Sequence, residues 1–159
     1  MPQKKFSIAH KDEEMRELMS KTDHKTLAIW AIDCAERVMP YFEEKYPDDH
    51  RPRQAIETLK TWLETEVFAM AVIRKASLDA HAAAKEIGND SPASSAAHAA
   101  GQAVATAHVR THAYGPAIYA QQAIFRASNP SDADVAVARE REWQYLHLRK
   151  LAGSLKSED

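Results

Sequence analysis

Apolar side chains return every three or four positions along most of this 159-residue chain, the spacing that places them on one face of an α-helix. The first stripe consists of Leu27, Trp30, Ala31, Cys34, Val38 and Tyr41. The second consists of Ala55, Ile56, Leu59, Trp62 and Leu63. The third consists of Ala69, Val72, Ile73, Ala76, Ala80, Ala83 and Ile87. No stretch of strand-like alternation competes with these stripes, so the pattern predicts an all-α fold.

Prolines and a glycine mark where these helices begin and end. Pro52, Pro92 and Pro116 each suit a first helical turn, where the missing N–H costs nothing, and Ser91 can cap the helix that follows it. Gly88 suits the end of the helix before it. The signals predict a single-domain bundle of about seven helices over 1–159, with an ordered core at about 10–152 and an alanine-rich central pair. The helices are expected at roughly 10–20, 23–45, 52–65, 67–87, 92–113, 116–128 and 131–152.

Composition adds limits on the class of protein. The net charge is −2, so no basic excess attracts nucleic acid. The least charged stretch, 91–125, contains several histidines and a Gly-Pro pair, and no run of about 20 apolar residues exists to span a membrane. The polar N-terminus does not resemble a signal peptide, and the single cysteine, Cys34, is consistent with a reducing compartment. These features predict a cytoplasmic protein.

Histidines provide one candidate site. His98, His108 and His112 fall on one broad side of the helix expected at 92–113, and His81 could join them from a neighbouring helix. Histidines four residues apart can share a metal ion, but Val109 stands where a zinc protease would have its glutamate base. One interpretation is a histidine-bound divalent metal in a helical-bundle enzyme. The other, which we favour, is that the histidines pack between helices and hydrogen-bond there.

Charged residues provide a second candidate site. The tentative binding residues are Asp33, Glu36, Asp49, Arg51 and Arg53. The two arginines could grip a carboxylate or phosphate through two hydrogen bonds each. They could equally pair with nearby carboxylates and lock two helices together, which is the interpretation that we favour.

Sequence signatures of common enzymes are missing. The chain contains no Walker loop, no dinucleotide fingerprint, no nucleophile elbow and no paired C-x-x-C. Cys34 lies on an apolar stripe without a nearby activating group, so we expect a buried thiol rather than a nucleophile. We therefore expect no catalytic residues, no cofactor, and a protein that acts by binding.

Several short motifs, in order, resemble the Imm-5-like family of putative bacterial immunity proteins. They are Trp30-Ala-Ile-Asp33-Cys34-Ala35-Glu36-Arg37, Asp49-His-Arg51-Pro52-Arg53-Gln-Ala55-Ile56-Glu57, Ala80-His81-Ala-Ala83-Ala84, Ala97-His98-Ala-Ala100, Ala107-His108, His112-Ala113 and Tyr119-Ala120. The resemblance covers roughly residues 25–125. It implies an all-α protein, encoded near secreted toxins, that binds a toxin and blocks it.

The partner predicted from this resemblance is a protein toxin. The acid-rich stretch Glu43-Glu44 to Asp48-Asp49 is a candidate patch for it, since an inhibitor often carries charge opposite to that of its target. The alternatives are the metal-binding enzyme and a scaffold that forms a homodimer through its alanine-rich faces.

Overall fold

The computed structural model describes Phe6 and residues 12–156, with side chains described as far as residue 153. Within this part of the chain every regular element is a helix. The elements are α1 (Glu13–Ser20), α2 (His24–Glu36), α3 (Met39–Glu43), α4 (Arg51–Thr65), α5 (Met70–Glu86), α6 (Pro92–Ala105), the 3-10 helix η1 (Arg110–Ala113), α7 (Tyr114–Ala127) and α8 (Ala133–Lys156). The all-α single-domain bundle predicted from the sequence is confirmed. Residues 10 and 11 of the first predicted helix lie outside the described residues.

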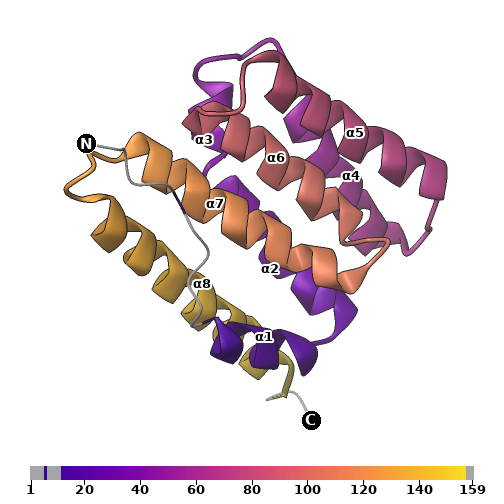
Figure 1. The fold of residues 1–159 in the computed structure, drawn as a ribbon. Coiled ribbons are helices and arrows are strands. Elements are labelled where there is room, and N and C mark those ends of the chain that lie inside the picture. Colours follow the sequence, from indigo (N-terminus) through magenta and orange to yellow (C-terminus); the bar gives the residue numbers. More distant parts are fainter. Residues whose placement is uncertain (1–5, 7–11, 157–159) are drawn as a thin grey trace.

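Helix α6 is the centre of the bundle. It contacts α5 on one side and α7 on the other, with α2, α3 and α4 packed against it as well (Figure 1). Its buried positions are Ala93, Ser94, Ser95, Ala96, Ala97, Ala99, Ala100, Gly101, Ala103 and Val104. Such small side chains let neighbouring helix backbones approach closely, which is why one helix can touch so many others. The alanine-rich stretch is therefore a buried core helix, and no described helix is long and apolar enough to cross a bilayer.

The ends of α6 and α5 follow the local signals in the sequence. The Ser91 hydroxyl accepts a hydrogen bond from the Ser94 N–H at 3.1 Å, and Pro92 occupies the first turn. Gly88, just beyond α5, has a φ of +91°, a left-handed conformation that favours glycine. These two boundaries agree with the prediction because capping and turn chemistry are local properties.

The single helix predicted at 23–45 is wrong, because the chain breaks into α2 and α3. Arg37 and Val38 form a turn between them, and the Val38 N–H bonds to the carbonyl of Ala35 at 3.1 Å. Pro40 has no N–H to donate to the Glu36 carbonyl, four residues earlier, so a continuous helix cannot form here. The turn allows Phe42 to be fully buried.

The helix predicted at 92–113 is also too long. After Ala105 the chain tightens into a turn, Val109 becomes extended, and a separate 3-10 helix follows. His24 explains part of this break, since its Nε2 lies 2.5 Å from the carbonyl oxygen of Thr106. Arg110 explains the rest, because its guanidinium donates to the carbonyls of Met19 (2.7 Å) and Thr22 (2.5 Å). These are contacts across the fold that local pattern cannot reveal.

A polar network crosses the core between α2, α7 and α8. The Trp30 Nε1 donates to the backbone carbonyl of Gln144 at 2.9 Å. The Gln144 side chain accepts from Gln121 at 2.9 Å and donates to the Ala117 carbonyl at 3.0 Å. All of these side chains are buried. Because each polar atom named here has a partner, the network fixes the register of the three helices without a desolvation penalty.

Candidate protein-binding surface

Three of the charged residues selected from the sequence, Asp49, Arg51 and Arg53, lie at the start of α4 and form ion pairs there. Arg51 binds both carboxylate oxygens of Asp49, at 2.9 and 2.7 Å, and both oxygens of Glu86 on α5, at 3.1 and 2.6 Å. Asp49 also accepts from the Arg51 N–H at 3.2 Å, at the first turn of the helix. The Arg51 guanidinium lowers the pKa values of both carboxyls. Arg51 therefore ties the start of α4 to α5.

Arg53 makes an equivalent bridge on the other side of α4. It donates to Glu43 of α3 through Nε and Nη2, at 3.1 and 2.5 Å, and it also bonds to Glu36 of α2. The hydrogen bond from Arg53 lowers the pKa of Glu43. A partner protein that bound Glu43 would compete with Arg53 for the same carboxylate. The arginines thus join α4 to α2, α3 and α5, and we call the group Glu36, Glu43, Asp49, Arg51, Arg53 and Glu86 the ion-pair cluster.

Asp33 belongs to a different arrangement, between α2 and α8. His147 Nε2 lies 2.7 Å from the Asp33 carboxylate, and the His147 ring stacks on Trp143. The same indole lies under the Arg37 guanidinium at 3.7 Å, and Arg37 forks onto Glu140, whose side chain is 2% exposed. Stacked, doubly hydrogen-bonded arginine is suited to satisfying a buried carboxylate. These contacts hold α8 onto α2.

Cys34 lies under this layer and is fully buried. Burial raises the pKa of its thiol, and the nearby carboxylates of Glu140 and Asp33 raise it further. The buried thiol expected from the sequence is confirmed, and it has neither the access nor the thiolate character of a nucleophile.

Two of the four candidate histidines come together, at the contact of α5 and α6. The Nδ1 atoms of His81 and His98 lie 2.6 Å apart, and His98 stacks on Tyr119 of α7. A Cβ on Gly101 would lie 2.7 Å from His81 Nε2, so this position needs glycine for the ring to fit. Burial lowers the pKa of both imidazoles, for His98 to about 4, where the neighbouring His81 contributes as well. The pair is neutral at pH 7.

The other two histidines lie elsewhere, because α6 ends before reaching them. His112 in η1 faces Gln102, with 3.2 Å between Nδ1 and Oε1. His108 stacks on Phe68 from the α4–α5 loop, with 6.0 Å between ring centres. Across the described residues, no three histidine, cysteine, aspartate or glutamate side chains come together in a way that could hold a metal ion. The one-sided helix face that placed His98, His108 and His112 together does not exist.

A surface that sequence reasoning missed lies at the opposite end of α4 from the ion-pair cluster. Four large apolar side chains stand in water there: Val67 (69% exposed), Phe68 (47%), Val72 (56%) and Val109 (36%). We call these four residues the apolar corner. The first three come from the α4–α5 loop and the start of α5. Val109 comes from the turn after α6. This turn lies beside the α4–α5 loop (Figure 1), and the His108 ring in it stacks on Phe68 of that loop.

Hollows flank the apolar corner. A groove of about 460 Å³ runs between α4 and α5, with Trp62, Val72 and Ile73 among its apolar lining residues. A second hollow lies along the outer side of α5, beside Arg74, Lys75 and Leu78, the last being 61% exposed. Other exposed large apolar residues, such as Val135 and Leu146 on α8, stand singly. An apolar patch between hollows is the kind of surface that binds another protein.

The sequence does contain a signal for this surface. Residues 67–73 read Val-Phe-Ala-Met-Ala-Val-Ile, seven consecutive apolar side chains. One face of a helix cannot bury so long a run, so part of it must face solvent or a partner. The prediction that Ala69 and Val72 belong to the buried third stripe is wrong. Helix α5 begins at Met70, and in its first turn only Ile73 is buried.

Comparison with known proteins places this fold in a family. Residues 17–151 match the family described as Imm-5 like putative immunity protein. The match spans most of the chain, so the chain belongs to this family, as the short motifs indicated. No curated protein and no solved structure matches the chain.

Proposed function

We propose that this chain is an immunity protein that acts in the bacterial cytoplasm by binding a protein toxin and blocking it without catalysis. Membership of the Imm-5-like family supports the class of function. The observation that carries the proposal is the apolar corner, because a folded protein gains nothing from keeping Val67, Phe68 and Val72 in water unless a partner covers them.

The chemistry around the corner indicates the kind of toxin surface that fits. An apolar side chain of the toxin would enter the groove over Trp62 and Ile73, and fill it as an interface anchor does. Arg74 is exposed on α5 next to Val72, whereas Lys75 beside it is paired with Asp79 at 2.5 Å. The toxin surface around that anchor would therefore carry a carboxylate opposite Arg74. The regular helices α4 and α5 hold these groups in place before binding, which lowers the entropy cost of association.

The acidic stretch Glu43-Glu44 to Asp48-Asp49 is a weaker candidate for the same task. Two of its carboxylates, those of Glu43 and Asp49, already bind the arginines of the ion-pair cluster. A toxin that bound these carboxylates would compete with the arginines that join the helices of the bundle.

The test is protection of cells that express the toxin encoded beside this gene. Val72→Asp changes the corner, and Val135→Asp is its matched control. Each valine is the third residue of its helix, and the two side chains are 56% and 55% exposed. We expect the wild type and Val135→Asp to restore growth and to form a complex with the toxin in size-exclusion chromatography. Val72→Asp should do neither.

Three results would count against the proposal. Protection that needs no complex would point to another mode of action. Equal protection by Val72→Asp and the wild type would remove the corner as the docking surface. A homodimer that Val72→Asp dissociates, with no toxin bound by the wild type, would make the corner a self-association surface instead.

A further inference from the structure

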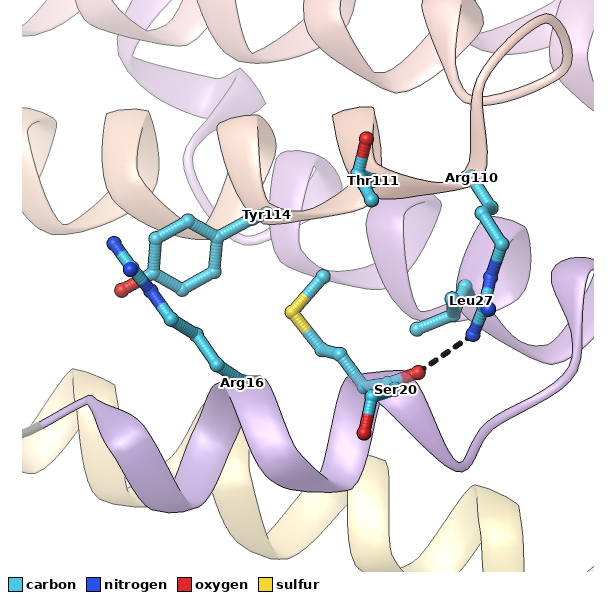
Figure 2. Close-up of a pocket in the computed structure, with 7 residues that line it drawn as sticks. Arg16, Ser20, Leu27, Arg110, Thr111 and Tyr114 are labelled. Carbon is cyan, nitrogen blue, oxygen red and sulfur yellow. Dashed lines mark hydrogen bonds between the residues drawn. The ribbon is translucent and has the colours of Figure 1, made fainter.

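A further hollow lies on another part of the molecule, between α1, α2 and the segment formed by η1 and the start of α7. It has a volume of about 430 Å³, the size of a small-molecule site. Figure 2 shows side chains from both walls pointing toward the space. The lining residues are Arg16, Met19, Ser20, Leu27, Arg110, Thr111 and Tyr114.

The base of this pocket is apolar. Met19 and Leu27 are 7% and 1% exposed, and the ring of Tyr114 lies beside the Arg16 side chain (Figure 2). Tyr114 is held in place because its hydroxyl donates to Asp12 at 2.5 Å. That bond and burial raise the pKa of Tyr114, so its hydroxyl stays protonated. The pocket is therefore a preformed apolar binding site for the non-polar part of a ligand.

The charged groups of the lining are both positive. The Arg16 guanidinium lies over the Tyr114 ring, 5.4 Å from its centre, with its side chain on the solvent side of the pocket. The Arg110 guanidinium lies at the other end. No carboxylate is among the lining residues. Asp12 beneath the wall is engaged by Tyr114 and lies 3.8 Å from Arg141. The electrostatic potential in the pocket therefore favours an anion.

Arg110 also has unused hydrogen-bonding capacity. One of its terminal nitrogens donates to two backbone carbonyls, of Met19 and Thr22. Its Nε is the buried side-chain polar atom that has no partner in the described part of the chain. Buried donors without partners are rare in folded proteins, and this one belongs to a side chain that lines the pocket, so its guanidinium has donor capacity left for an anion.

We propose that this pocket binds a small anion with an apolar body, of the class of a medium-chain or aromatic carboxylate. The carboxylate lies between the two guanidinium groups, and the apolar part lies on Met19, Leu27 and the Tyr114 ring. This site is separate from the apolar corner and does not depend on the chain being an immunity protein.

The experiment is isothermal titration calorimetry of the full chain with sodium octanoate, octyl phosphate, octanol and octylammonium. We expect saturable binding of one octanoate per chain that weakens as salt is raised. Octylammonium should not bind, and octanol should bind more weakly than octanoate. Tighter binding of octyl phosphate than of octanoate would support an anionic head group and identify a phosphate ester as the preferred one. Equal binding of octanol and octanoate would overturn the anionic head, and no saturable heat with either anion would overturn the site.

Variants then locate the binding. Arg16→Gln shortens the side chain, removes its charge and should raise the octanoate Kd about tenfold. Thr111→Glu places a carboxylate at an exposed position of the lining and should abolish binding. Thr61→Glu, at an exposed position on α4, is its matched control and should leave binding unchanged. Circular dichroism melting confirms that each variant folds. Octanoate binding that survives Arg16→Gln and Thr111→Glu but is lost in Val72→Asp would place it at the apolar corner and refute the proposal.

Discussion

The two ends of α4 differ in how their side chains are satisfied. At its start, Arg51 and Arg53 bind four carboxylates that come from α2, α3, α5 and the loop before α4. At its end, Glu66 takes a left-handed φ of +59°, the helix stops, and Val67 and Phe68 stand in water. The first end looks like a binding site in the sequence and is occupied by the protein itself. The second end is marked in the sequence only by the apolar run at 67–73, and the fold leaves its large apolar side chains exposed.

This difference shows that a functional surface is better recognised by what remains unsatisfied than by which residues are conspicuous. A bidentate arginine pair that already joins helices would lose as much as it gained by moving to a partner. An exposed valine or phenylalanine gains free energy from any partner that removes it from water. Substitutions of paired charges should therefore change stability, whereas substitutions of exposed apolar side chains should change binding.

The largest effect is expected at the Arg37–Glu140 pair, because its carboxylate is the most deeply buried of the ion-paired side chains named above. Arg37→Met removes the partner of Glu140, a carboxylate with 2% exposure, and leaves an uncompensated charge in the core. Losses of this kind cost about 3–5 kcal/mol of unfolding free energy. Urea denaturation followed by circular dichroism measures the change. The double variant Arg37→Met with Glu140→Gln should recover most of the loss, and a single variant as stable as the wild type would show that the pair does not hold α8 to α2.

The next effect concerns binding rather than stability. Phe68→Ala should weaken the complex with the toxin by about 2–4 kcal/mol, as expected for an aromatic anchor at the centre of an interface. Its unfolding free energy should change by less than about 0.5 kcal/mol because the side chain is 47% exposed. Surface plasmon resonance gives the affinity. Tyr41→Ala, at an aromatic residue 39% exposed on α3, is the matched control and should bind normally.

A smaller effect is expected in the ion-pair cluster. Arg53→Met leaves Glu36 and Glu43 without their shared partner and should cost about 1–2 kcal/mol of stability, with toxin binding unchanged. Arg53 lowers the pKa of Glu43 in the folded state, so this stabilisation is present above the unfolded pKa of 4.5 and is lost as the pH falls through the folded value. The difference between wild type and variant should therefore shrink in acid. Arg74→Met, at an exposed arginine, should leave stability unchanged.

The sequence was sufficient for most of the fold and for little of the site. Helix type follows from apolar spacing, and the caps at Ser91 and Gly88 are local, so both could be predicted. The breaks at Pro40 and after Ala105 were missed. The first break arises because Pro40 has no backbone N–H, and it lies within an apolar stripe whose spacing alone predicts a continuous helix. The second depends on bonds from His24 and Arg110 to distant carbonyls, which no local pattern encodes.

The site was harder because sequence shows which groups are present but not which are already paired. Asp49 and Arg51 are conspicuous together, yet only the fold shows that they bind each other and Glu86. Within the run at 67–73, Ala69, Val72 and Ile73 were assigned to the third apolar stripe because of their helical spacing. The exposure of this run depends on where α5 begins and on what α4 leaves uncovered, which are properties of the packed molecule.

The smallest effect concerns the histidines. They show the same difference between side chains paired with each other and side chains at the apolar corner. His81 and His98 satisfy each other through Nδ1 atoms 2.6 Å apart, whereas His108 lies at the apolar corner against Phe68. Burial holds the folded-state pKa of His98 at about 4, below its ordinary 6.5. Between these two values the unfolded chain binds more protons than the folded one, so stability must fall as the pH falls.

His98 is only partly buried, so we expect a loss of only about 1 kcal/mol between pH 7 and pH 5, or roughly 2–4 °C in Tm. Imidazole NMR resonances followed against pH give the pKa directly. A His98 pKa near 4 means that the pair is a neutral hydrogen bond that holds α5 to α6, as satisfied as the arginines of α4. A pKa above 6.5 would mean that the pair keeps a shared proton, and stability would then rise as the pH falls. Gly101→Ala should reduce the shift, because a Cβ there forces the His81 ring away from His98, but burial of His98 should still keep its pKa below 6.5.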